Sequence, residues 1–241
     1  MFGLGALINT AAVALGGFLG LLCGKLLNEN MQKTLMVACG AATIFIGAAG
    51  TLEGMLVIEN GKIKAEGSML LVLSLVIGGF IGELIGIERL MTKLGDKLKG
   101  LVKAGGNSRF TEGFVNTSLI ICTGAMAIVG SVEDGLSGDF SMLAAKSVLD
   151  FVIVVILAST HGIGVVFSAG AILIYEGAIT LIAHFAGSFI SEELISLLSY
   201  IGSALIFLIG INIAFDKKIR VGNLLPALII PVIYLGIKGV V

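Results

Sequence analysis

The sequence contains no tryptophan, only 2 prolines in 241 residues, and few charges, since Asp, Glu, Lys and Arg together make up 13%. Soluble globular proteins have roughly 25% charged residues. Hydrophobic residues reach 57%, and the mean hydropathy is +1.10. A water-soluble fold of this length cannot bury so much apolar surface, so the composition predicts a protein that lies in a lipid bilayer. The 35 glycines and the absence of alternating polarity favour packed membrane helices over a β-barrel.

Other missing features exclude several classes of function. The net charge is -1, so no strongly basic surface indicates nucleic-acid binding. The three cysteines are an odd number in apolar stretches and predict reduced thiols. His161 and His184 are isolated, which predicts no metal site, and no nucleotide-binding, hydrolase or metalloprotease motif indicates a cofactor or an enzyme. No basic residue precedes the first apolar run, so we expect that run to be retained rather than cleaved as a signal peptide.

Eight apolar runs are long enough to cross about 30 Å of hydrocarbon. They lie near residues 3–24, 34–54, 68–87, 113–131, 142–160, 162–185, 194–215 and 223–240. They predict an all-α, polytopic transmembrane helical bundle that forms a single integral membrane domain over residues 1–241. The last span contains Pro226 and Pro231, which can kink it.

Positive charge is unevenly distributed among the connections of an eight-span chain. Eleven basic residues, mostly in connections 88–112 and 216–222, lie on one side, and four lie on the other. Because basic connections stay in the cytoplasm, we predict that both connections are cytoplasmic and that both termini lie outside.

Residues 88–103 have a pattern of their own. Leu90, Leu94, Leu98 and Leu101 recur at helical spacing, with lysines on the remaining face. This predicts a basic amphipathic helix on the anionic inner leaflet. We interpret it as a connector that fixes topology, with lipid sensing or partner docking as the alternative.

Two glycine-rich segments are similar. Residues 16–24 read GGFLGLLCG and residues 78–86 read GGFIGELIG, which indicates an internal duplication. Glycines four residues apart share a helix face and allow close approach of a second helix. The pattern predicts that the first and third spans pack together or form a homo-oligomer contact through Gly16, Gly20, Gly24, Gly78, Gly82 and Gly86. A shorter similarity, between Ile8-Asn9-Thr10 and Val115-Asn116-Thr117, does not establish an inverted repeat.

Ionisable residues inside membrane spans cost about 2.5–3.5 kcal/mol each on insertion scales, so they usually have a function or a partner. Glu83 lies about one turn from the basic connection, which favours a structural role. Lys146 and Asp150 are four residues apart and share a helix face. Lys146 and Glu176 lie fifteen residues before and after His161, so antiparallel helices that meet there bring them to a similar depth. The predicted cluster has a net charge of -1, which one proton or one monovalent cation would neutralise.

Polar side chains near these charges extend the candidate site. Thr180 and Thr10 add hydroxyls, and the predicted substrate- or ion-binding residues are Asp150, Lys146, Ser147, Glu176, Asn116, Thr123, Asn9 and Tyr175. The alternative is an internal salt bridge that fixes two helices, with hydroxyls bonded to carbonyls of their own helices. We favour a binding site because charged clusters at the membrane midplane are typical of transporters.

Several segments resemble one known family over nearly the whole chain. They are residues 6–10 followed by Gly16-Gly17, residues 122–128 leading to 130 and 133–139, residues 145–151, and residues 223–227. Together they resemble the bacterial inner-membrane family called domain-of-unknown-function family 554. The resemblance implies a polytopic inner-membrane protein, in some members described as a transport protein, with no substrate to carry over. Lys146, Ser147 and Asp150 match the central motif, whereas Glu176 replaces the Gln expected in the family.

The sequence therefore predicts a secondary transporter or facilitator of a small solute, with proton or cation coupling. In this interpretation Asp150 binds the coupling ion or a cationic group, Lys146 balances its charge, and Asn9, Asn116 and Thr123 orient the solute. Two alternatives stay open: an ion or solute channel lined by the same residues, and a non-transporting scaffold or regulator. The expected partners are the bilayer, an unidentified solute or cation, and a second copy of the chain.

Overall fold

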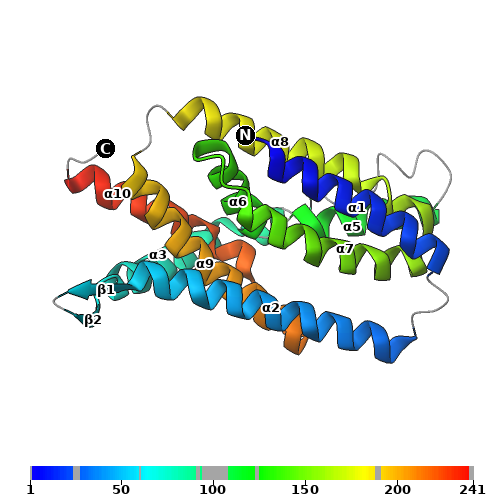
Figure 1. Cartoon of the computed structure of the whole chain (residues 1–241), viewed down its shortest axis with the longest axis horizontal. Helices are drawn as coiled ribbons and strands as arrows, with labels where there is room; N and C mark the ends of the chain where they lie inside the picture. Colours follow the sequence, from blue (N-terminus) through cyan, green and yellow to red (C-terminus); the bar gives the residue numbers. More distant parts are fainter. Residues whose placement is uncertain are drawn as a thin grey trace.

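The computed structural model describes residues 2–23, 28–59, 61–90, 93, 108–122, 125–187 and 191–238 (Figure 1). Helices dominate these residues, which confirms the predicted all-α bundle. The α-helices are α1 (Leu4–Cys23), α2 (Glu29–Met55), α3 (Ser68–Ile85), α5 (Ser108–Cys122), α6 (Ala125–Leu136), α7 (Ser141–His161), α8 (Ser168–Ala186), α9 (Glu192–Phe215) and α10 (Ile229–Lys238). Two 3-10 segments, η2 (Gly162–Val165) and η4 (Val221–Leu228), precede α8 and α10.

Six helices of the described chain are long and apolar enough to cross a membrane, namely α1, α2, α3, α7, α8 and α9. The other two predicted spans, 113–131 and 223–240, do not appear as single long α-helices within the described residues. The first contains α5 and α6, and residues 123–124 between them lie outside the described residues. The second begins as η4, where Pro226 has no N–H to donate to an α-helical hydrogen bond.

The helices form two groups (Figure 1). The first lobe consists of α1, α5, α6, α7, α8 and η2, and the second lobe consists of α2, α3, α9, η4 and α10. Contacts between α6 and α9 join the lobes, and a hydrophobic cluster contains side chains from both: Cys39, Met126, Leu149 and Ile206. Residues distant in sequence therefore form each lobe.

Glycines allow the backbones within each lobe to approach closely. A Cβ atom at Gly20 would lie 2.4 Å from the carbonyl oxygen of Val155, so α1 packs on α7. A Cβ atom at Gly82 would lie 1.8 Å from the carbonyl oxygen of Asn223, so α3 packs on η4. The predicted pairing of the first and third spans is therefore wrong, because other segments of the same chain occupy their glycine faces. The homo-oligomer itself stays a prediction, but these faces are already occupied within the chain.

The directions of the helices follow from these contacts. Gly5 meets Leu143 and Gly20 meets Val155, so α1 and α7 run in the same direction. Successive glycines along α2 contact α9 in reverse chain order, so these two helices are antiparallel. The same holds for α3 and η4. One end of the bundle consequently contains the basic connection 216–222, the first turn of α2 and the last turn of α3. We call it the basic end.

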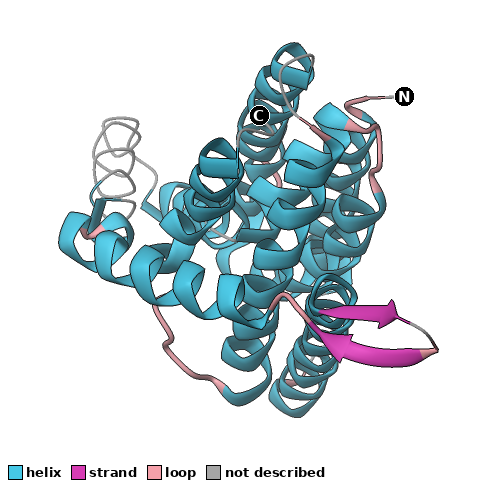
Figure 2. Ribbon diagram, turned by 90° about the vertical axis from the view of Figure 1, so that its left-hand side faces the viewer, coloured by secondary structure: helices cyan, strands magenta, loops and turns pink. Residues whose placement is uncertain are grey.

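A small β-hairpin lies at the opposite end and extends beyond the helices (Figure 2). Strands β1 (Leu56–Glu59) and β2 (Lys62–Ala65) pair antiparallel and are exposed. This hairpin was not among the predicted elements. Its signal in the sequence is Asn60-Gly61 between residues 56–59 and 62–65, because Gly61 has a φ of 72°, which suits a tight hairpin turn.

The predicted amphipathic helix 88–103 lies outside the described residues except for 88–90 and 93. Of the basic residues in connection 216–222, Arg220 forms an ion pair with Glu83 at 2.6 Å. Both side chains are about half exposed, so this pair contributes little to stability. Glu83 thus has a partner at the basic end, and its structural role stays a prediction.

Candidate functional site

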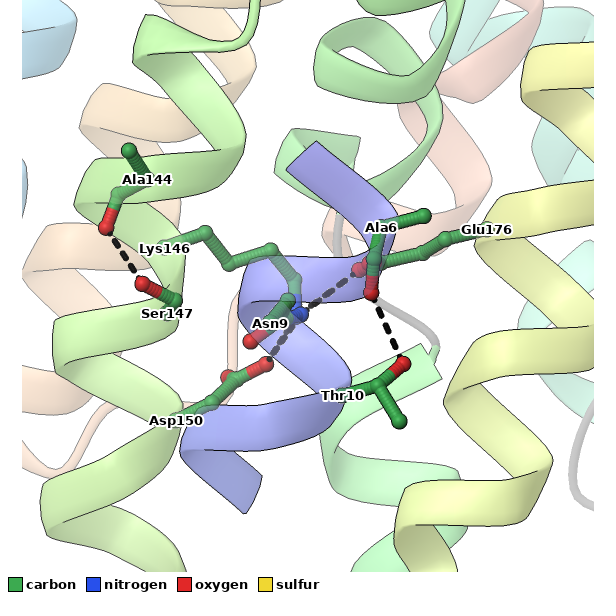
Figure 3. Close-up of polar contacts among 8 residues, drawn as sticks. All are labelled: Ala6, Asn9, Thr10, Ala144, Lys146, Ser147, Asp150 and Glu176. Atoms are coloured by element: carbon green, nitrogen blue, oxygen red, sulfur yellow. Dashed lines mark hydrogen bonds and ion pairs between the residues drawn. The ribbon is translucent and has the colours of Figure 1, made fainter. Parts of the chain in front are cut away.

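Four polar side chains from three helices meet inside the first lobe (Figure 3). The Lys146 ammonium forms an ion pair with Asp150 on its own helix and lies 3.4 Å from Oε1 of Glu176 on α8. Asn9 of α1 uses both hydrogens of its amide, donating to Asp150 Oδ2 at 3.0 Å and to Glu176 Oε1 at 2.9 Å. We call Asn9, Lys146, Asp150 and Glu176 the charged cluster.

The charged cluster is almost completely buried. Lys146 and Asp150 are each 4% exposed, and Asn9 and Glu176 are 0% exposed. Two carboxylates and one ammonium leave a formal charge of -1 in a region of low dielectric constant. Burial of an unbalanced charge is costly, so this arrangement favours uptake of one positive charge.

Several oxygen atoms at and beside the cluster have no hydrogen-bond partner within the described part of the chain. They include Oδ1 of Asn9, Oε2 of Glu176, and the hydroxyls of Thr180 and Ser131. Buried polar groups in proteins are nearly always satisfied. Unsatisfied oxygens at one place are therefore candidate contacts for a bound species.

A cleft of about 1280 Å³ reaches the cluster from the basic end. It lies between the two lobes, and Lys146 and Asp150 form part of its wall. Apolar side chains of α7 and α9 line its middle, whereas polar and charged residues line its mouth: Glu29, Gln32, Lys33, Glu88, Asn212 and Asp216. A solute from the basic end could thus reach the buried charges through a largely apolar passage.

The opposite end of the first lobe is closely packed. Leu143 is 0% exposed and lies one turn beyond Lys146, against Gly5 of α1 and Gly130 of α6. The buried carboxylate of Asp134 accepts hydrogen bonds from the backbone N–H groups of Gly3 and Gly5, at 3.1 and 3.0 Å. These N–H groups at the start of a helix attract a negative charge. Asp134 therefore fixes the first turn of α1 to α6.

The structure brings together only part of the predicted site. Lys146, Asp150, Glu176 and Asn9 meet as described, whereas the Ser147 hydroxyl donates to the carbonyl of Ala144 on its own helix. Tyr175 is half-buried one residue before Glu176. Asn116 belongs to α5, but its side chain, like the whole of Thr123, lies outside what the structure describes. The binding roles of all eight residues stay predictions.

A second polar network, which the sequence did not indicate, lies at the mouth of the cleft. The Asn223 side chain donates to Glu83 Oε2 at 2.6 Å and accepts from the backbone N–H of Glu88 at 2.8 Å. Burial raises the pKa of the Glu88 carboxyl, and the Arg220 guanidinium opposes that shift. The sequence of η4 contains no pattern that predicts that Asn223 faces α3.

We predict that the cleft admits reagents from the basic end only. In a protein without native cysteines, Ile153→Cys should react with a membrane-impermeant maleimide only from the side that the basic end faces, which the charge bias predicts to be the cytoplasm, because Ile153 lines the cleft. Val154→Cys is the matched control, since Val154 is next to it and 0% exposed. Labelling in inside-out and right-side-out vesicles measures the difference. Equal labelling of Ile153→Cys from both sides would contradict a one-sided cleft.

Comparison with known proteins gives the family. The family model described as "Protein of unknown function (DUF554)" matches residues 4–235. The chain is 31% identical over 227 residues to "Uncharacterized membrane protein YdfK" of Bacillus subtilis (strain 168), with 94% of this chain and 93% of the relative covered. It is 28% identical over 231 residues to "Uncharacterized protein YqgA" of Escherichia coli (strain K12), with 94% of each chain covered. No solved structure matches the chain. Because the family model spans almost the whole chain, this membrane protein belongs to the DUF554 family.

Proposed function

We propose that this protein is a secondary transporter or facilitator of a small solute, and that the charged cluster is its binding site. The observation that carries the proposal is the cleft, which reaches the buried Lys146–Asp150 pair from one end of the bundle. A buried site open to one side at a time is what alternating access requires. The two-lobe arrangement supports it, because one lobe can move against the other.

The residues of the cluster have separate roles in this proposal. Asp150 lines the cleft and binds a cationic group of the solute or a coupling ion. Lys146 balances the two carboxylates while the site is unoccupied by solute. Asn9 holds Asp150 and Glu176 at a fixed separation through its two donated hydrogen bonds. Binding offsets the free-energy cost of desolvating the two carboxylates. The occupied and the empty protein therefore favour different conformations.

The close packing around Leu143 argues against a continuous pore and therefore favours a carrier over a channel. A scaffold without transport would need the same cluster only as an internal ion pair. The unsatisfied oxygens of Asn9 and Glu176 favour a binding site over that alternative, because a purely structural network leaves fewer buried groups unpaired.

The test is solute movement in proteoliposomes. The purified protein would be screened for uptake or charge movement with a panel of small metabolites and cations, alongside Asp150→Asn. We expect the wild type to move at least one compound class and Asp150→Asn to lose that activity by a factor of 100 or more, since about 2.7 kcal/mol of lost interaction corresponds to such a factor.

Asp139→Asn is the matched control, because it makes the same chemical change in an exposed connection. Asp139 accepts a hydrogen bond from the Ser141 backbone at 2.9 Å, and Asn retains this capping function. It should leave transport unchanged. Currents far above carrier turnover would indicate a channel. Flux of no compound, from protein of normal stability, would favour the scaffold.

A further inference from the structure

The cluster has oxygen ligands that the described ion pairs do not use. Both hydrogens of the Asn9 amide face the carboxylates, so its carbonyl oxygen is turned away from them and has no hydrogen-bond partner among the described residues. On the neighbouring helix, Glu176 uses Oε1 for Asn9 and Lys146, whereas its Oε2 has none. Both residues are 0% exposed, so bulk water does not solvate these atoms.

Two buried hydroxyls belong to the packed helices α6 and α8, the second of which carries Glu176. Thr180 is one turn after Glu176 on α8 and so shares its helix face. A Cβ atom at Gly135 would lie 2.4 Å from the carbonyl oxygen of Thr180, which places α6 directly against α8. Ser131 is one turn before Gly135 on the same face of α6. Because α6 and α8 run in the same direction, Ser131 faces the stretch between Glu176 and Thr180.

These hydroxyls differ from two other buried hydroxyls of the described chain. The buried hydroxyls of Thr43 and Ser168 donate to carbonyls of the preceding helical turn, at 2.9 and 2.6 Å. The hydroxyls of Thr180 and Ser131, which are 1% and 0% exposed, have no such bond within the described chain. Their lone pairs are therefore available to a ligand.

We propose that Glu176 Oε2 and the hydroxyls of Thr180 and Ser131 form a binding site for one small monovalent metal cation. All three ligands are oxygens, which hard cations prefer. One positive charge neutralises the cluster, whereas a divalent ion would leave it with an excess charge. Lys146 stands beside this site as a fixed positive charge, so it weakens cation binding and limits the site to a single ion. The inference deepens the proposed function, on which its role in coupling rests, by naming the coupling ion.

The experiment is thermal unfolding of the purified full chain in NaCl, KCl or LiCl, compared with N-methylglucamine chloride at equal ionic strength. We expect one alkali cation to raise the Tm by roughly 5–10 °C at about 100 times its Kd. Binding of radioactive Na⁺ measures the same site directly. Equal Tm values in all four salts, or stabilisation by low pH alone, would overturn the proposal, the latter because a proton then occupies the site.

Variants assign the ligands. Glu176→Gln should abolish the cation-dependent shift, and Thr180→Val should weaken Na⁺ binding by about tenfold. Thr43→Val is the matched control, because the Thr43 hydroxyl is bonded within its own helix, and it should keep the full shift. Lys146→Met should bind the cation about tenfold more tightly, because a repelling charge is removed. A shift that Glu176→Gln and Thr180→Val both retain would contradict the assignment.

Failure of this inference differs from failure of the proposed function. Cation binding without movement of any solute or ion would support the site and reject the transporter. Solute flux that is independent of alkali cations and unchanged in Thr180→Val would support the transporter and reject the cation site.

Discussion

Gly82→Ala should destabilise the protein by about 2–3 kcal/mol or more, because overpacking of a closely packed contact costs that much. The added Cβ would lie 1.8 Å from the carbonyl oxygen of Asn223, and backbone atoms cannot move aside as the end of a flexible side chain can. The substitution forces α3 away from η4 and separates two segments of the second lobe. Because the chain lacks tryptophan, circular dichroism is the appropriate measurement of thermal unfolding in detergent.

Two controls distinguish this contact from a general effect of alanine. Gly79→Ala, on the same helix, would meet only the end of the Leu224 side chain at 2.9 Å and should have a much smaller effect. Gly177→Ala has open space around its added Cβ and should stabilise α8 by roughly 0.5–1 kcal/mol through helix propensity. Similar losses in Gly82→Ala and Gly177→Ala would show that helix contact is not the cause.

Lys146→Met should have the largest effect of any substitution in the charged cluster, a loss of about 3–5 kcal/mol in the absence of alkali cations. Removal of the ammonium leaves the buried carboxylates of Asp150 and Glu176 side by side with no counter-charge. The Met side chain has similar length, so the change tests charge rather than packing. Thermal unfolding in N-methylglucamine chloride measures it.

A triple variant isolates the electrostatic cause. The combined variant Lys146→Met, Asp150→Leu and Glu176→Gln removes all three formal charges and should recover most of the lost stability, because a buried ion cluster can be replaced by neutral groups at little cost. If the combined variant is less stable than Lys146→Met alone, the cluster stabilises the fold by its own attraction. Such a result would support the purely structural interpretation of the ion pair.

The sequence determined the main features of this protein through properties that depend on composition and local spacing. High hydropathy with few charges requires a bilayer, and helices are the spanning structure that satisfies every backbone group within one segment. The spacing of Lys146, Asp150 and Glu176 about His161 predicted their meeting correctly, because a short turn forces two helices to run antiparallel. Asn9 was a candidate only as a polar residue in an apolar span, and the sequence did not indicate which acids it would contact.

The tertiary structure alone decided which helices pack together. A glycine stripe shows that a helix has a face for close contact, but not which helix occupies it, so the predicted pairing of the two glycine-rich spans was wrong. The 3-10 segment η4 depends on neighbouring helices that satisfy freed backbone groups, and the hydropathy of a whole span does not reveal such a segment. The cleft exists because the lobes meet through α6 and α9 and separate towards the basic end. Long-range packing of this kind places Asp150 at the bottom of a passage, and no local pattern in the sequence encodes it.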